Sequence, residues 1–148
     1  METRGGSGGV TVVVDASIAA AWLLPEKDSD AAEAVIAALS GRSPVPSLFW
    51  HEIRNILIMA ERRGRIVAGE PAAAMGRLRR LPLEDAGAGS DGAVLALALA
   101  HGLTAYDAAY LALAQARGLP LATLDQKLAA AAHREGVALL GPLQGSHE

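Results

Sequence analysis

The sequence predicts a single α/β domain in which helices cover a mostly parallel sheet. The chain has 148 residues, the usual length of one domain, and 51% of them are hydrophobic, enough to build one core. Short apolar runs alternate with longer helical segments, and this alternation is typical of βαβ units. The first run, VTVVV at 10–14, is apolar throughout, which indicates a central strand buried on both faces.

The first half of the chain is expected to consist of a leader, two strands and four helices. Residues 1–9 (METRGGSGG) are rich in glycine and are predicted to be a flexible leader, so the domain is placed at 10–141. Ser47 is a suitable N-cap for the helix after it. The expected elements are a strand at 10–14, an alanine-rich helix ending before Pro25, a helix at 30–39, a short strand at Val45, a helix at 47–63 and a helix at 70–80.

The second half contains two helices that are apolar almost all round, which is typical of buried helices. Gly102 and Gly118 are suitable residues to end them. A polar tail is predicted at 142–148. The expected elements are an edge strand at 81–85, helices at 90–100 and 105–117, a strand at 119–124, a helix at 126–135 and a strand at 136–140.

Composition excludes several classes of function. The chain has no cysteine, so a disulfide framework, a thiolate zinc site and a cysteine nucleophile are all excluded. The longest wholly apolar run, at 93–100, is far shorter than the roughly 20 residues of a membrane span, and no signal peptide is recognisable. We therefore expect a cytoplasmic protein without a membrane partner. The net charge of −3 argues against indiscriminate coating of nucleic acid.

Two aspartates directly follow predicted strands. Asp15 ends the run VVVDAS, and Asp125 lies in LATLDQKL after the strand at 119–124. In open parallel sheets the functional crevice lies at the carboxyl ends of the strands. Each aspartate is also a good N-cap for the helix that follows, so either residue alone is weak evidence for a site.

Two further acids are placed on the inner side of helices. On the helix at 47–63, Glu52 falls between Ile56 and Met59 on the apolar stripe. Asp107 begins a helix made mostly of Ala, Leu and Tyr, although Thr104 three residues earlier also allows a capping box. A carboxylate beside a buried helix is costly unless a cation or hydrogen-bond donors compensate its charge.

These four acids predict a metal site built from oxygen ligands. Such a set suits Mg²⁺ or Mn²⁺, which keep bound waters and commonly bind phosphate groups. The reaction indicated is phosphodiester hydrolysis. The predicted catalytic and metal-binding residues are Asp15, Glu52, Asp107 and Asp125.

VVVDAS, the E-x-x-N segment from Glu52 to Asn55, LTAYDAAYLALA and LATLDQKL together resemble a PIN-domain ribonuclease of the VapC toxin type. The resemblance extends from Val10 to about Leu140. It implies a five-stranded parallel sheet of order 3-2-1-4-5, cleavage of single-stranded RNA with Mg²⁺ or Mn²⁺ held by the four acids, a cognate antitoxin and a homodimer. Ser17, Asn55 and Thr123 match positions that support the acids.

Basic and aromatic residues add two weaker hypotheses. Six of the thirteen basic residues lie between 62 and 80, which indicates either a solvated surface or a rim that binds the RNA backbone. Trp22, Phe49 and Trp50 fit core packing, or alternatively a hydrophobic groove for an antitoxin helix. The predicted RNA-binding residues are Arg62, Arg63, Arg65, Arg77, Arg79 and Arg80.

The alternative function is a catalytically weak PIN-like domain, or a receiver-like domain, that acts as a protein-binding or signalling module. A receiver requires an acidic pair after the first strand and a lysine after the last, whereas Ala16 follows Asp15 and no lysine follows Lys127. The presence of all four acids weighs against a degenerate nuclease.

Overall fold

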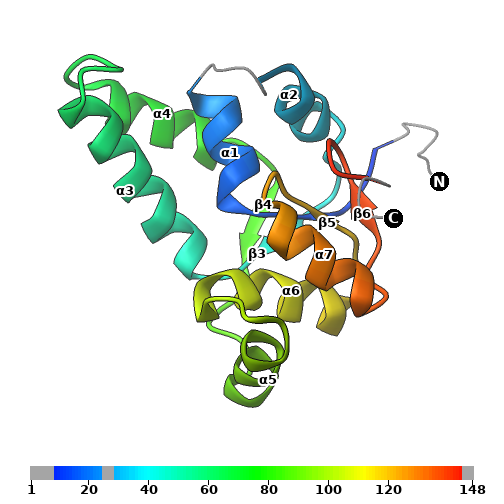
Figure 1. Ribbon diagram of the computed structural model, residues 1–148. Coiled ribbons are helices and arrows are strands. Elements are labelled where there is room, and N and C mark those ends of the chain that lie inside the picture. The colour runs from blue at the N-terminus through cyan, green and yellow to red at the C-terminus, as the bar shows by residue number, and fades with distance from the viewer. Residues whose placement is uncertain (1–8, 25–28, 145–148) are drawn as a thin grey trace.

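The computed structural model describes residues 9–24 and 29–144, and in it helices lie on both sides of short parallel strands (Figure 1). Each predicted helix and strand has a counterpart; β3 is longer than the strand predicted at Val45, and the other strands are shorter than predicted. The elements are β2 (Val13–Val14), α1 (Ala16–Leu23), α2 (Ser29–Ala37), β3 (Ser43–Val45), α3 (Leu48–Arg62), α4 (Glu70–Arg79), β4 (Leu83–Asp85), α5 (Asp91–His101), α6 (Ala105–Arg117), β5 (Leu121–Ala122), α7 (Gln126–Arg134) and β6 (Leu139–Leu140).

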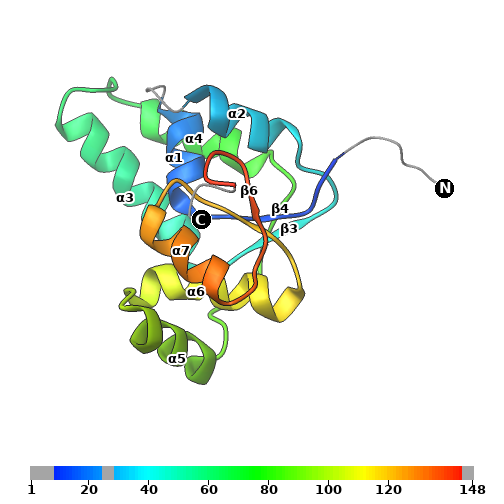
Figure 2. The same cartoon turned by 45° about the vertical axis from the view of Figure 1, so that its right-hand side comes forward.

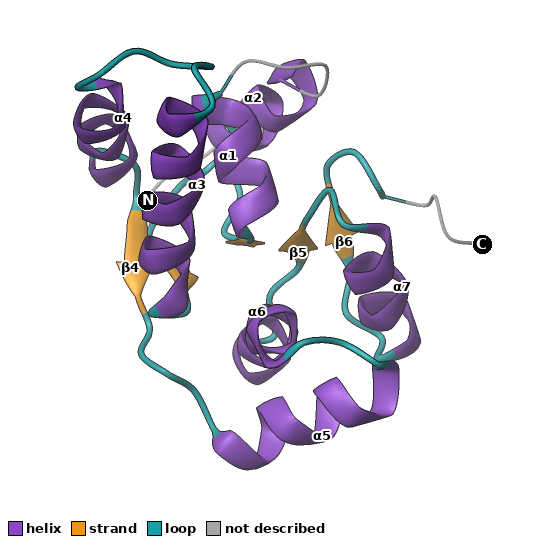
Figure 3. Cartoon of the chain, turned by 60° about the vertical axis from the view of Figure 1, so that its left-hand side comes forward, coloured by secondary structure: helices purple, strands orange, loops and turns teal. Residues whose placement is uncertain are grey.

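The strands form two parallel groups. β5 lies between β2 and β6, with Val13 opposite Leu121 and Leu121 opposite Leu139, and β3 pairs separately with β4. Figure 3 shows α1 and α2 on one side of the strands and α5 and α6 on the other. The α/β architecture with a parallel sheet is therefore confirmed.

A continuous five-stranded sheet is not present in the described residues, so the order 3-2-1-4-5 is not confirmed. The break falls between β2 and β3. The Val12 N–H donates to the Ser43 side chain at 3.2 Å rather than to a backbone carbonyl. Pro44, in the middle of β3, has no N–H to donate. A side chain and a proline thus take the place of ladder hydrogen bonds at this join.

The core lies around the strand that starts the domain. Val12, Val13 and Val14 are fully buried, as the all-apolar run predicted. Helix α6 contributes Leu111 and Tyr110 to the same core. Figure 2 shows α3 and the loop that follows it at the left of the molecule, with α4 behind α1 and with α5 and α6 below. The predicted leader and tail lie mostly outside the described residues, and Leu143 packs on the core.

The prediction that α5 is buried is wrong. Only Leu97 and Ala98 of this helix are buried, whereas Leu95 is 55% and Leu99 84% exposed. The reason is that α5 lies on the outside of α6, farthest from the strands, so that one face is covered and the other is bare (Figure 3). The sequence of α5 is apolar on all sides, but the rest of this chain covers only the side around Leu97 and Ala98.

The predicted N-cap role of Ser47 is also wrong. Its hydroxyl donates to Asp85 Oδ1 at 2.7 Å, and it makes no capping hydrogen bond to α3. The contact instead ties the start of α3 to the end of β4. Glycines at 102 and 118 end α5 and α6 with φ of +64° and +63°, as predicted.

In the part of the chain that the structure describes, no single helix is long and apolar enough to cross a membrane. The pair Asp91–His101 and Ala105–Arg117 passes the length and composition criteria together, with a bend of 116° between the two helices.

Candidate active site

The four predicted acids lie at the beginnings of helices or just inside them. Asp15 and Asp125 are the N-caps of α1 and α7, at the carboxyl ends of β2 and β5, which pair in parallel. Glu52 lies in the second turn of α3 and Asp107 in the first turn of α6. The parallel pairing of β2 with β5 therefore places two of the acids at one edge of the sheet.

Asp15 is the most buried acid, with 4% of its surface exposed. Its Oδ1 accepts hydrogen bonds from the Ser17 hydroxyl at 2.6 Å and from the N–H groups of Ser17 and Ile18, and its Oδ2 accepts from the Thr123 hydroxyl at 2.5 Å. Burial raises the pKa of Asp15 from 3.8 to about 6, because desolvation outweighs these donors. A carboxylate in this state is costly to ionise in the absence of a cation.

Ser17 and Thr123 connect the ends of β2 and β5 through Asp15. The Ser17 hydroxyl also accepts from the Leu124 N–H at 2.9 Å, and the Thr123 hydroxyl accepts from the Asp125 N–H at 2.9 Å. Two of the three predicted supporting residues, Ser17 and Thr123, therefore donate hydrogen bonds to one of the four acids, Asp15. Asn55 differs: it is exposed and, among the described residues, makes no hydrogen bond to any of the four acids.

Glu52 is half-buried and contacts a residue to which the sequence assigned no role. Its Oε1 accepts a 2.5 Å hydrogen bond from the hydroxyl of Tyr110, which is 1% exposed. Burial raises the pKa of Glu52, the Tyr110 hydroxyl opposes that rise, and the charge of Asp107 adds to it. Tyr110 follows Asp107 by three residues, so both lie on one side of α6. That i, i+3 spacing in DAAY is the sequence signal that could have identified Tyr110.

Asp107 and Asp125 also lie close enough to interact through their charges. Burial raises the pKa of Asp107, and the neighbouring charge of Asp125 raises it further. The charge of Lys127, on the first turn of α7, opposes this rise. The predicted capping contacts coexist with these interactions: Thr104 Oγ1 accepts from the Asp107 N–H at 3.1 Å, and Asp125 Oδ1 accepts from the Lys127 N–H at 2.9 Å.

The donor set fits a hard divalent cation in its chemistry. It consists of carboxylate oxygens, and within the described residues no arginine or lysine forms an ion pair with any of the four acids. In the same described ranges, however, no group of three or more Asp, Glu or His side chains is arranged to hold a metal ion. Binding a cation would therefore require these side chains to draw together.

The six arginines lie along the α3–α4 hairpin. Arg77 forms a 3.7 Å ion pair with Glu70, and the Arg79 guanidinium lies 3.9 Å from the centre of the Trp50 ring. Arg62 ends α3 ten residues after Glu52, a rise of about 15 Å along the helix. Arg62 therefore lies at a distance from Glu52, and among the described residues none of the six arginines forms an ion pair with any of the four acids.

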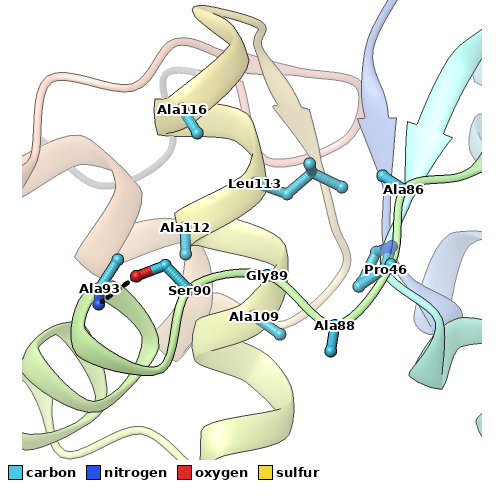
Figure 4. A pocket seen from close by; sticks show the side chains of 11 residues that line it. Pro46, Ala86, Ala88, Gly89, Ser90, Ala93, Ala109, Ala112, Leu113 and Ala116 are labelled. Atoms are coloured by element: carbon cyan, nitrogen blue, oxygen red, sulfur yellow. Dashed lines mark hydrogen bonds between the residues drawn. The ribbon is translucent and has the colours of Figure 1, made fainter.

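A shallow pocket lies on another face, between the loop after β4 and helices α5 and α6 (Figure 4). Its walls are small apolar side chains, including Pro46, Ala109 and Leu113. Ser90 caps α5 there by accepting a hydrogen bond from the Ala93 N–H at 3.3 Å. None of the four acids lines this pocket, so it is separate from the candidate active site.

Comparisons with known proteins identify the family and the fold. The profile of the PIN domain family matches residues 12–134. A search of curated protein sequences gives no significant match.

Solved structures share the fold. PAE2754 from Pyrobaculum aerophilum is 29% identical, with a TM-score of 0.58 over 83% of this chain and 86% of that one. VapC20 of Mycobacterium tuberculosis, a toxin that cleaves the sarcin-ricin loop, is 14% identical, with a TM-score of 0.64 over 89% of this chain and 100% of that one. A toxin–antitoxin complex from Klebsiella pneumoniae contains a chain that is 19% identical, with a TM-score of 0.57 over 79% and 88%.

Proposed function

Because the chain belongs to the PIN domain family, we propose that it is a metal-dependent endoribonuclease, the toxin of a toxin–antitoxin pair. Its substrate would be single-stranded RNA, cut by hydrolysis of a phosphodiester bond in the cytoplasm. The observation that carries the proposal is the set of acids with Asp15 at its buried end, which receives hydrogen bonds but no compensating cationic side chain among the described residues. The structural similarity to toxins supports it through the fold.

Each residue has a defined task in this proposal. Asp15, Glu52, Asp107 and Asp125 would hold Mg²⁺ or Mn²⁺, which supplies Lewis acidity toward a phosphoryl oxygen. Ser17 and Thr123 orient the Asp15 carboxylate through its two oxygens. Lys127 lies near enough to Asp107 to balance part of the negative charge when a phosphate approaches.

The basic hairpin would bind the RNA backbone on one side of the acids. The separation of about 15 Å along α3 would place this contact away from the scissile bond, on a flanking part of the strand. Arg62 and Arg63 suit this role best, since Arg77 and Arg79 already contact Glu70 and Trp50. A net-negative protein could in this way bind a polyanion at one defined place.

The antitoxin is proposed to dock on the outer side of α3 and α4. Phe49 and Trp50 are buried in the core, at 0% and 7% exposed, so the predicted groove does not include them. A groove between α3 and α4 is lined by the apolar residues Ile58, Pro71 and Ala72 and by the charged residues Glu61 and Arg62, so a partner there would also cover part of the proposed RNA-binding surface. Val67 on the same hairpin is 72% exposed. An amphipathic helix of the partner would cover these side chains.

A homodimer is proposed through α5. Leu95 and Leu99 are exposed on this helix, and Tyr106, at the start of α6, is 63% exposed. The helix carries no charged side chain between Asp91 and His101. An uncharged apolar face suits a self-complementary contact between two copies across a twofold axis.

The test is cleavage of a labelled single-stranded RNA by the purified chain. Asp107→Asn is expected to lower the rate by orders of magnitude, and EDTA should abolish it until Mg²⁺ or Mn²⁺ is restored. Asp30→Asn is the matched control, because Asp30 is likewise an acid in the first turn of a helix but is exposed on α2. Activity that survives both EDTA and Asp107→Asn would favour the protein-binding alternative with a contaminating nuclease.

A further inference from the structure

Tyr110 makes the closest side-chain contact to Glu52, and the proposed chemistry does not yet use it. The tyrosine hydroxyl on α6 donates to Glu52 Oε1 on α3 at 2.5 Å, across 58 positions of sequence. The tyrosine ring is 1% exposed and Glu52 is half-buried. This hydrogen bond therefore joins two helices that each supply one of the four acids.

Packing alone does not account for this pairing. A buried tyrosine hydroxyl requires an acceptor, but a neutral backbone carbonyl would serve and would add no charge to the interior. Here the acceptor is a carboxylate that is already partly desolvated and lies within electrostatic reach of Asp107. Desolvating the Glu52 carboxylate near Asp107 costs free energy, whereas a hydrogen bond from Tyr110 to a neutral acceptor would not carry this cost.

The side-chain hydrogen bonds to Asp15, like the one to Glu52, come from neutral hydroxyl groups. Asp15 receives its side-chain hydrogen bonds from the hydroxyls of Ser17 and Thr123, and Glu52 receives one from Tyr110. Within the described part of the chain no guanidinium or ammonium group is paired with either acid. A neutral donor fixes the direction of a carboxylate but leaves its charge in place for a cation, whereas an arginine would cancel that charge.

We propose that Tyr110 is a positioning residue that fixes the Glu52 carboxylate beside Asp107 for binding of a divalent cation. The inference rests on the proposed metal dependence and adds to it one residue and its role. Tyr110 does not contact the cation or the RNA; it acts through Glu52. Three hydroxyls, from Ser17, Thr123 and Tyr110, then form a neutral frame, here called the hydroxyl frame, around the buried Asp15 and half-buried Glu52 carboxylates.

The first test is the affinity of the full chain for Mn²⁺, measured by calorimetry and by electron paramagnetic resonance without RNA. Tyr110→Phe keeps the ring and removes only the hydroxyl, and it is expected to weaken Mn²⁺ binding about 10- to 100-fold, as loss of a partner behind a ligand does. Tyr106→Phe is the matched control on the same helix. Because Tyr106 is 63% exposed, its loss should leave the affinity unchanged.

A double-mutant cycle separates positioning from a general loss of structure. If Tyr110 acts through Glu52, then Tyr110→Phe should have no further effect on Mn²⁺ affinity in a Glu52→Gln background. An equal loss in both backgrounds would show that the hydroxyl supports the fold only, and would overturn the inference.

A spectroscopic test avoids substitution of Tyr110 altogether. The chain has two tyrosines, so Tyr106→Phe leaves Tyr110 as the single tyrosine signal. With ring-labelled tyrosine, the Cζ resonance of Tyr110 is expected to shift when Mg²⁺ is added, because its acceptor now shares charge with the cation.

The outcomes distinguish this inference from the proposed function. Wild-type protein that binds Mn²⁺ while Tyr110→Phe binds it equally well, or a Cζ resonance that Mg²⁺ leaves unmoved, overturns the role of Tyr110 and leaves the nuclease intact. Wild-type protein that binds no Mn²⁺ overturns both the role and the metal dependence.

Discussion

Replacement of Asp15 by asparagine is expected to stabilise the metal-free protein at neutral pH. Asp15 is 4% exposed, and burial raises its pKa from 3.8 to about 6. A shift of about two units corresponds to about 3 kcal/mol, which the folded state loses when the carboxylate ionises. Asparagine is of similar size, has no charge, and caps helices as well as aspartate does.

The direction of the pH dependence follows from whether the folded or the unfolded chain binds the Asp15 proton more tightly. Because the pKa of Asp15 is higher in the folded than in the unfolded chain, this group favours folding fully below about pH 4, and the advantage disappears as pH rises through about 6. Asp15→Asn has no such dependence. The variant should therefore gain up to about 3 kcal/mol relative to wild type between pH 4 and pH 8, or about 6 to 12 °C in Tm for a chain of this size.

The assay is urea and thermal unfolding of both proteins in chelator at the two pH values. The substitution also changes the hydrogen bond to Thr123, but this effect is about the same at pH 4 and pH 8. The change with pH in the stability difference between wild type and variant therefore reports the ionisation of the Asp15 carboxylate. Asp85→Asn is a control of opposite sign, since hydrogen bonds from the Gly87 N–H and Ser47 lower the pKa of the exposed Asp85. A stability gap between wild type and Asp15→Asn that is the same at pH 4 and pH 8 would refute the reasoning.

Three further predictions concern the surfaces. If the proposed dimer forms through α5, Leu99→Glu should give a monomer in light scattering, whereas Val67→Glu on the α3–α4 hairpin, 72% exposed against 84% for Leu99, should leave the dimer intact. Arg62→Gln with Arg63→Gln should reduce the slope of log affinity for RNA against log salt by about 0.7 for each lost phosphate contact, and Arg117→Gln on α6 should leave it unchanged. A small protein encoded next to the gene for this chain should copurify with the chain and inhibit its nuclease activity. Its binding should also alter the fluorescence of Trp22, the partly buried tryptophan of α1.

Local patterns predicted the parts of the site that depend on strand ends. VVVDAS and LATLDQKL placed Asp15 and Asp125 correctly, because an aspartate after a buried strand reaches the carboxyl edge of a parallel sheet whatever the details of packing. The inward position of Glu52 also followed from helical periodicity. Its contact with Tyr110 did not, since the two residues are 58 positions apart and only the tertiary fold brings their side chains together.

The errors have the same origin in long-range packing. The apolar sequence of α5 predicted burial, but the single chain covers only the side around Leu97 and Ala98. Serine is a common N-cap residue, but the Ser47 hydroxyl donates a hydrogen bond to Asp85 on β4 and does not cap α3. Pro44 and the Ser43 side chain likewise interrupt the sheet between β2 and β3, where the family resemblance implied one continuous sheet of five strands.

Under the proposed metal dependence, the hydroxyl frame accounts for the absence of an arginine paired with Asp15 among the described residues. An arginine beside Asp15 would lower the pKa of Asp15 and remove the roughly 3 kcal/mol cost of ionising it. It would also neutralise the negative charge that attracts a cation. With neutral donors the penalty persists until a cation binds. A cation at 100 times its Kd stabilises the folded state by about 2.7 kcal/mol, which nearly equals the cost of ionising Asp15. The metal-free chain should therefore be the less stable form at neutral pH, and the same carboxylate that weakens it should give the bound cation its affinity.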